Sequence, residues 1–158
     1  MRDIPPGASA RHDLVVTEAM TVDFEDRYDP RLGRLHPVYA TYWLVKHMEL
    51  VGRKLVLPFL EDDEEGIGHA VSVRHTASAL PGMRVSLRAR FERVEGNRVY
   101  VSCVATSELG DTVGEGETVQ VVLKRAVIEA GFARLRRRWG ADVVEEGAPP
   151  RGPADEQV

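Results

Sequence analysis

The chain has 158 residues, a formal net charge of −4 and a hydrophobic fraction of 43%. This length predicts one domain with a hydrophobic core of its own. The acidic balance argues against a general nucleic-acid binder, because such proteins present a basic surface. Cys103 is the single cysteine, so no disulfide can form within the chain, which agrees with a reducing compartment.

The amino-terminal residues lack the apolar stretch of a signal peptide. No apolar run reaches the ~18 residues that span a bilayer, so we expect a cytoplasmic protein with no membrane partner. Residues 1–11 are interpreted as a flexible lead-in and residues 12–139 as the folded domain. The tail at residues 140–158 is rich in proline, glycine and acidic residues, which predicts disorder.

The first predicted elements are a short strand at residues 12–18 and, after an irregular charged stretch, a long helix. Pro37 is placed where a first helical turn would begin, and Pro58 marks where the helix must end. Such a helix would be ~30 Å long. It is apolar on nearly every face, which predicts burial in the middle of the protein.

Beyond an acidic loop at residues 61–66, the hydrophobic period changes from 3.6 to 2. Four strands are predicted, at residues 67–77, 83–92, 98–108 and 112–124. Tight turns separate them, which indicates antiparallel hairpins with one wet and one dry face. Residues 126–139 then resemble a short basic helix.

This order of elements predicts an α+β fold. A curved antiparallel sheet of about five strands would wrap around the long central helix, because an apolar helix needs a dry surface on more than one side. The arrangement resembles the hotdog fold, and a plain α+β sandwich is the alternative. The exposed sheet edge of such a fold is commonly closed by a second copy, which favours a homodimer.

Three polar residues lie where the amphipathic pattern predicts apolar or boundary positions. Thr41 lies on the sheet-facing helix stripe, Glu49 lies about 80° away at its edge, and His75 shares a strand face with Val71 and Val73. An inward carboxylate should be paired, protonated or functional. The three could therefore line one catalytic cleft. Taken singly, such residues are more often a core histidine, a solvated glutamate and a threonine bonded to its own helix.

Several motifs resemble the fluoroacetyl-CoA thioesterase family in order and spacing. They are Ala40-Thr41 at the opening of the central helix, Met48-Glu49, a glycine-containing strand that ends in His75-Thr76, and Pro81-Gly82. The resemblance covers roughly residues 12–125. It implies a hotdog thioesterase dimer that hydrolyses an acyl-CoA to CoA and a carboxylate. We expect no cofactor beyond the CoA of the substrate, and no metal.

The resemblance also implies roles for individual residues. Glu49 would attack the thioester or activate water, His75 would assist proton transfer, and Thr41 would position the reacting group. Substrate-binding residues would be Gly68, Leu32, Leu35 and Tyr39. The two leucines occupy lid positions where the family carries aromatic residues, so we expect a short or aromatic acyl group rather than selectivity for fluoroacetyl.

Two other functions share this fold and stay open at this point. One is an acyl-CoA hydratase or dehydratase, although its characteristic close Asp and His pair is not found. The other is a non-catalytic module that binds acyl-CoA. The histidines show no metal-ligand spacing, and Cys103 alternates with apolar residues as a core position does.

Overall fold

The structure is a computed structural model that describes residues 1–24, 29–33 and 35–140. The predicted tail lies outside the described residues except for Gly140. The chain divides into two compact units, Met1–Lys124 and the residues from Arg125 onward, which are considered separately.

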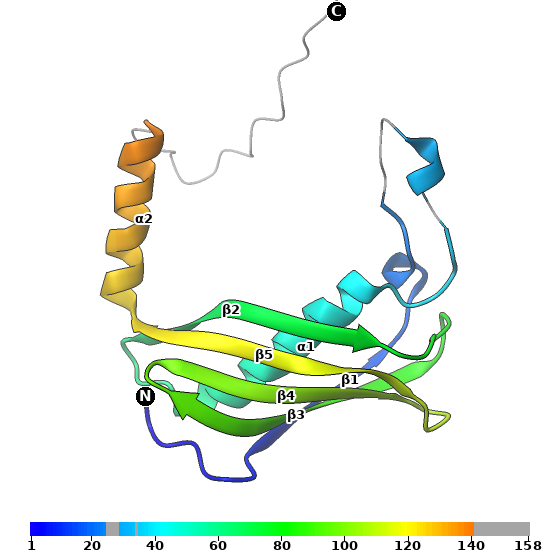
Figure 1. Cartoon of the computed structure of the whole chain (residues 1–158), viewed down its shortest axis with the longest axis horizontal. Coiled ribbons are helices and arrows are strands. Elements are labelled where there is room, and N and C mark those ends of the chain that lie inside the picture. The colour runs from blue at the N-terminus through cyan, green and yellow to red at the C-terminus, as the bar shows by residue number, and fades with distance from the viewer. Residues whose placement is uncertain (25–28, 34, 141–158) are drawn as a thin grey trace, which may run out of the picture. The chain divides into compact units, whose positions relative to one another are not determined.

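The first unit is built on a five-stranded antiparallel sheet with the strand order β1-β3-β4-β5-β2 (Figure 1). The strands are β1 Ser9–Val15, β2 Glu64–His75, β3 Arg84–Glu95, β4 Arg98–Ser107 and β5 Thr112–Lys124. Strands β3, β4 and β5 follow one another through tight turns, as the alternating pattern predicts. The predicted α+β architecture is therefore confirmed.

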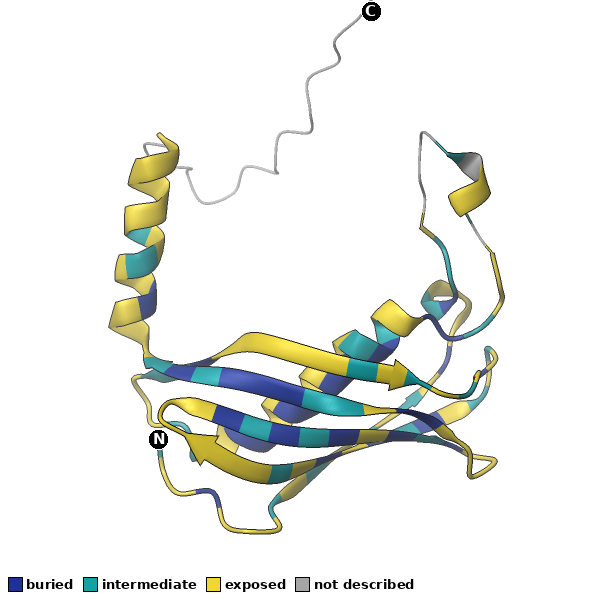
Figure 2. Cartoon of the chain, in the orientation of Figure 1, coloured by how far each residue is buried: buried dark blue, intermediate teal, exposed yellow. Residues whose placement is uncertain are grey.

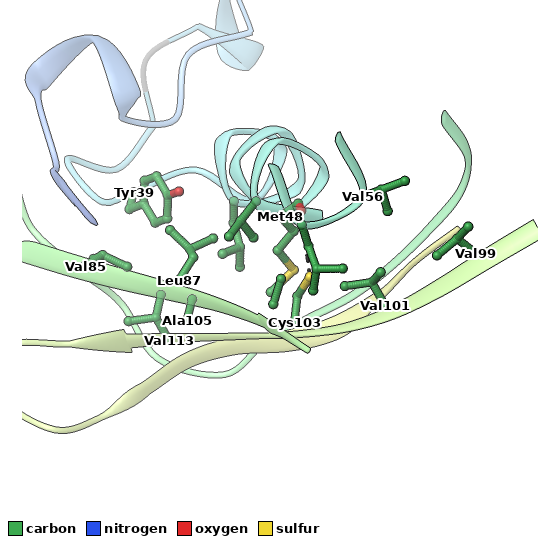
Figure 3. Close-up of a cluster of buried hydrophobic side chains, with 14 of the residues drawn as sticks. Tyr39, Met48, Val56, Val85, Leu87, Val99, Val101, Cys103, Ala105 and Val113 are labelled. Atoms are coloured by element: carbon green, nitrogen blue, oxygen red, sulfur yellow. Dashed lines mark hydrogen bonds between the residues drawn. The ribbon is translucent and has the colours of Figure 1, made fainter. Parts of the chain in front are cut away.

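The long helix α1, Thr41–Val56, packs across one face of this sheet and touches all five strands (Figure 1). Its buried side chains include Leu44, Met48 and Leu55. Met48 reaches toward Cys103 of β4 in the core cluster between helix and sheet (Figure 3). Alternate residues of β3 and β4 fill the rest of that core (Figure 2).

Two features of the central helix differ from expectation. It begins at Thr41 rather than at Pro37, because Tyr39 pairs with Thr21 in an isolated bridge and its amide bonds Ala79. The helix is also not buried on every face. Tyr42 and Leu50 each expose 40% of their surface, so α1 has a solvent-facing side in the single chain.

The first strand begins at Ser9, three residues before the predicted start and inside the expected lead-in. The chain end ahead of it is tied down as well. The amino group of Met1 forms an ion pair with Glu64 at 2.7 Å, and the Arg2 amide bonds Phe59. That ion pair holds the pKa of Glu64 down at about 2.

Strand β2 forms one edge of the sheet and contains a bulge. Gly68 pairs with Gln120 of β5, but Ala70 pairs with Val119, so His69 is the extra residue. A bulge of one residue reverses which side chains face inward. Before it Gly68 faces α1, and after it His75 does, although the two are seven positions apart.

The second unit contains the helix α2, Arg125–Trp139, close to its predicted range. It ends at Trp139 and is followed by Gly140, whose φ of 76° suits a glycine after a helix. Within the described residues, no helix has the length and hydrophobicity to cross a membrane.

Candidate active site

Thr41 and His75 form a direct pair at one end of β2. The hydroxyl Oγ1 of Thr41, the first residue of α1, lies 3.0 Å from Nδ1 of His75, the last residue of β2. Which atom donates depends on the histidine tautomer. The other ring nitrogen, Nε2, is buried and has no partner among the described residues. The pair thus leaves one imidazole nitrogen with unmet hydrogen-bonding capacity.

Glu49 lies at the other end of this surface, over Gly68. A Cβ atom added to Gly68 would collide with Oε1 of Glu49, so only glycine leaves room for the carboxylate there. Glu49 is exposed in the single chain. It makes no hydrogen bond or ion pair with any described residue, so this acid is available to a ligand or to another chain.

The single chain keeps these two groups apart. Thr41 and Glu49 are eight residues apart on α1, which is about 12 Å along the helix axis. His75 stays at the Thr41 end through its hydrogen bond. One chain therefore presents two half-sites, an imidazole with a hydroxyl and a carboxylate over a glycine.

Two buried polar residues of β5, Thr118 and Gln120, were missed by sequence reasoning, and Gln120 pairs with Gly68 across the two strands. Both amide atoms of Gln120 are buried without a partner among the described residues, and Oε1 would lie 2.6 Å from a Cβ placed on Gly66. The hydroxyl of Thr118 packs against Gly52 and has only the weakly polar Cys103 thiol beside it. Polar residues at two successive inward positions of a strand were the available signal.

A cluster of buried rings supports the histidine half-site. Tyr39 has no exposed surface, and its hydroxyl lies 2.5 Å from Nδ1 of His47. Its ring meets that of His75 edge to face, with 6.4 Å between centroids. Burial lowers the pKa of His47 to about 4 and raises the pKa of Tyr39. Both groups are therefore neutral at pH 7, and the tyrosine hydroxyl donates to the imidazole.

The predicted lid residues lie in the segment before α1. Leu32 and Leu35 expose 42% and 45% of their surface in the single chain. Tyr42, next to Thr41, ties this segment to the helix, because its hydroxyl donates to the Thr21 carbonyl at 2.9 Å and accepts from the Asp23 amide at 3.0 Å. The lining role of the two leucines stays a prediction.

Other candidates for chemistry are weaker. Burial raises the pKa of the Cys103 thiol to about 11, so it stays protonated and is a poor nucleophile. Across residues 1–24, 29–33 and 35–140, no three His, Cys, Asp or Glu side chains gather as a metal site would require. The side chains that could take part in a reaction are thus concentrated along β2 and α1.

Comparison with known proteins connects this geometry to an activity. Residues 16–126 match the profile of a family described as fluoroacetyl-CoA-specific thioesterase. The chain belongs to this family. The fluoroacetyl-CoA thioesterase of Streptantibioticus cattleyicolor is 32% identical over 135 residues, which span 85% of this chain and 94% of that protein.

Solved structures agree with this membership. A Thermus thermophilus hypothetical protein, described as a thioesterase superfamily member, is 59% identical, with a TM-score of 0.84 over 90% of this chain and all of that one. The fluoroacetyl-CoA thioesterase FlK is 29% identical, with a TM-score of 0.75 over 84% of this chain and 97% of that one. Structures of its variants contain acetyl-CoA, or fluoroacetate and CoA.

The chain is therefore a hotdog acyl-CoA thioesterase, a thioester hydrolase. The resemblance noted in the sequence is confirmed, and so are the fold and the class of reaction. The identity of the acyl group and the roles of individual residues are matters for proposal.

Proposed function

We propose that this thioesterase works as a homodimer in which Glu49 of one subunit acts together with Thr41 and His75 of the other. One observation carries the proposal: the two half-sites flank an edge strand, β2, whose outer side has no partner among the described residues. A strand edge of twelve residues is a ready template for pairing with a second chain.

The residue register of a symmetric pair of β2 strands supports this arrangement. In an isologous antiparallel pair the residue numbers of opposed positions add to a constant. A two-fold axis between Val71 and Ser72 would place Gly68 opposite the partner's His75. Adjacent strands lie about 4.8 Å apart, so the Glu49 carboxylate over Gly68 would come near the partner's imidazole. Each dimer would then hold two complete sites.

The chemistry follows from the groups so assembled. The carboxylate of Glu49 either attacks the thioester carbonyl carbon or takes a proton from the water that attacks it. The C–S bond breaks as the tetrahedral intermediate collapses, and a proton passed through His75 reaches the departing CoA sulfur. Where Glu49 has attacked directly, water then hydrolyses the resulting anhydride and restores the carboxylate. Thr41 holds the imidazole at Nδ1. Water and thioester become a carboxylic acid and a thiol.

The acyl group would occupy the space beside Gly68, with Leu32 and Leu35 as covering residues. A short or aromatic acyl group suits a pocket whose wall includes a strand without side chains at Gly66 and Gly68. The buried amide of Gln120 also favours one kind of acyl group over another. A buried amide left unpaired costs about 1–3 kcal/mol per group, so an acyl group with a hydrogen-bonding atom near its end would satisfy it.

Thiol release measures this function directly. E49Q and H75A should each lower kcat by about 1,000-fold or more while remaining dimers by light scattering, because each removes an acid–base or nucleophilic group. E92Q is the matched control, since Glu92 lies on the exposed side of β3 and accepts a hydrogen bond from Ser102. A screen of short, branched, halogenated and aromatic acyl-CoAs would identify the acyl group.

Full activity of E49Q or H75A would refute the assignment of these residues. A protein that binds CoA esters saturably but releases no thiol from the whole panel would contradict hydrolysis by this chain. A monomer with full activity would contradict the shared site.

A further inference from the structure

We propose that Tyr39, held in place by His47, is a positioning residue that orients the imidazole of His75. The inference deepens the proposed function and rests on it, because it assumes that His75 moves a proton during hydrolysis. Tyr39 has no exposed surface in the single chain, so this proposal gives it a role through His75 in place of the substrate contact that the resemblance implied.

The imidazole of His75 is restrained on two sides. Thr41 holds Nδ1 at 3.0 Å, and the ring of Tyr39 packs against it with an interplanar angle of 74°. Tyr39 lies at the end of the core that holds Val85 and Leu87, both fully buried, so its ring has a rigid backing (Figure 3). Rotation of the imidazole about its Cβ–Cγ bond would break the Thr41 hydrogen bond and disturb this edge-to-face contact.

The hydroxyl of Tyr39 has a function that packing alone does not require. A phenylalanine would fill the same space without a buried polar atom. The hydroxyl instead donates to Nδ1 of His47 at 2.5 Å, which fixes the phenol ring in its plane. His47 is itself fixed between the rings of Trp43 and Tyr39, with centroids 5.7 and 5.9 Å away.

The groups around His47 favour its neutral form. His12 of β1 lies 5.7 Å from it, ring to ring, and the positive charge of Lys46 is nearby. Burial, together with His12 and Lys46, disfavours protonation of His47, so its pKa is low and the ring is neutral at pH 7. A neutral imidazole with its proton on Nε2 leaves Nδ1 free to accept from the tyrosine hydroxyl.

A defined orientation of His75 matters for proton transfer. Geometric errors of about 1 Å in a reacting group can cost on the order of 100-fold in rate. Nε2 of His75 is buried without a polar partner in the single chain, so no hydrogen bond on that side determines the tautomer. The Thr41 hydroxyl on Nδ1 is then the described hydrogen-bond partner that can select the tautomer, and the Tyr39 ring keeps the imidazole turned toward it.

The test is a set of variants measured for kcat, KM and pH dependence. Y39L should lower kcat about 10- to 100-fold with KM changed less than about twofold, since the substrate does not touch Tyr39. Y39F keeps the ring and should recover most of that loss. Y39F, H47L and the double variant should lower kcat by the same few-fold factor, because they remove one hydrogen bond.

A measurement that does not depend on catalysis can distinguish a positioning role of Tyr39 from a purely structural one. The ring ¹⁵N chemical shifts of His75 in the substrate-free dimer report its tautomer. They should shift toward a tautomer mixture in Y39L and stay near the wild-type values in Y39F. The matched controls are Y100L and Y100F, because Tyr100 lies on β4 beneath Arg93, where no site residue is found among the described residues. Both should retain wild-type kcat and His75 shifts.

The outcomes are distinguishable. If H75A retains activity, the proposed function fails and this inference fails with it. If H75A is inactive but folded Y39L and H47L both keep wild-type kcat and His75 shifts, only the positioning role is overturned. If Y39L does not fold, equal losses in Y39F, H47L and the double variant still support the role, and independent additive losses refute it.

Discussion

The surroundings of His75, the last residue of β2, differ from those of Gly68 in the first half of the strand. At the His75 end, the imidazole is bonded to Thr41 and backed by a buried ring pair, Tyr39 and His47. At the Gly68 end, the carboxylate of Glu49 is exposed and lies over a residue with no side chain. One half-site is fixed before any partner or ligand arrives, and the other is left open.

This difference explains why a single chain is an incomplete enzyme under the proposed function. The proton-transfer group benefits from a rigid, partly buried setting, because its orientation determines its reactivity. The carboxylate must meet both substrate and imidazole, so it needs an approach that its own chain does not block. Pairing of β2 with its copy would join the fixed half-site to the open one.

Dimers that combine two different variants test whether the two half-sites of one active site come from different subunits, and the expected effect is the largest. E49Q and H75A homodimers should each be inactive, but coexpression should yield heterodimers with one intact site. About half of the dimers would be mixed, so total activity should recover to about a quarter of wild type. Purified mixed dimers carrying two different tags allow this to be measured by thiol release. No recovery in verified heterodimers would show that each site lies within one chain.

G68A targets the open half-site. The added Cβ would collide with Oε1 of Glu49 and displace the carboxylate, which should lower kcat roughly 100-fold. The backbone of Gly68 has no positive φ, so the fold should tolerate alanine. G131A in α2, whose Cβ would meet nothing closer than 3.9 Å, is the control. Wild-type kcat in G68A would place the reacting carboxylate elsewhere.

The buried rings of the fixed half-site should make stability depend on pH. His47 has a pKa of about 4 in the folded chain, below its unfolded value near 6.5. The unfolded state therefore binds more protons between pH 6.5 and pH 4, and the free energy of unfolding should fall by roughly 3 kcal/mol as the pH is lowered through that window. H47L should remove this dependence in urea unfolding measured at several pH values. An unchanged slope would contradict the neutral buried imidazole.

T41V tests the hydrogen bond of the fixed half-site. Valine keeps the shape of threonine but leaves Nδ1 of His75 without its partner, so kcat should fall about 10-fold. T41S keeps the hydroxyl and should retain most of the activity. Equal kcat values for T41V and T41S would show that the hydroxyl has no part in the reaction.

Q120L should have the smallest effect and should act on selectivity. Removing the unpaired amide behind the open half-site should favour purely apolar acyl groups over polar ones about fivefold in relative kcat/KM, which is close to 1 kcal/mol. Competition between two acyl-CoAs of similar size measures this ratio. An unchanged ratio would place the acyl group away from Gln120.

Much of this molecule could be predicted from local pattern. The alternation in β3, β4 and β5 and the helical period of α1 determine which residues enter the core, because a half-buried strand or helix repeats its apolar face at a characteristic spacing. The matching motifs around Thr41, Glu49 and His75 identified the family before any coordinates were considered. The predicted start of α1 at Pro37 was wrong by four residues, since Tyr39 pairs with Thr21 instead of entering the helix.

What only the tertiary structure decided is how the site residues face one another. In a regular strand Gly68 and His75 would lie on opposite faces, because they are an odd number of positions apart. The bulge at His69 reverses the alternation and turns both toward α1. Such a bulge depends on how β2 pairs with β5, and no local periodicity in β2 encodes it. For the same reason, the approach of Gln120 to Gly66 and the packing of Tyr39 against His75 emerged only when distant segments came together.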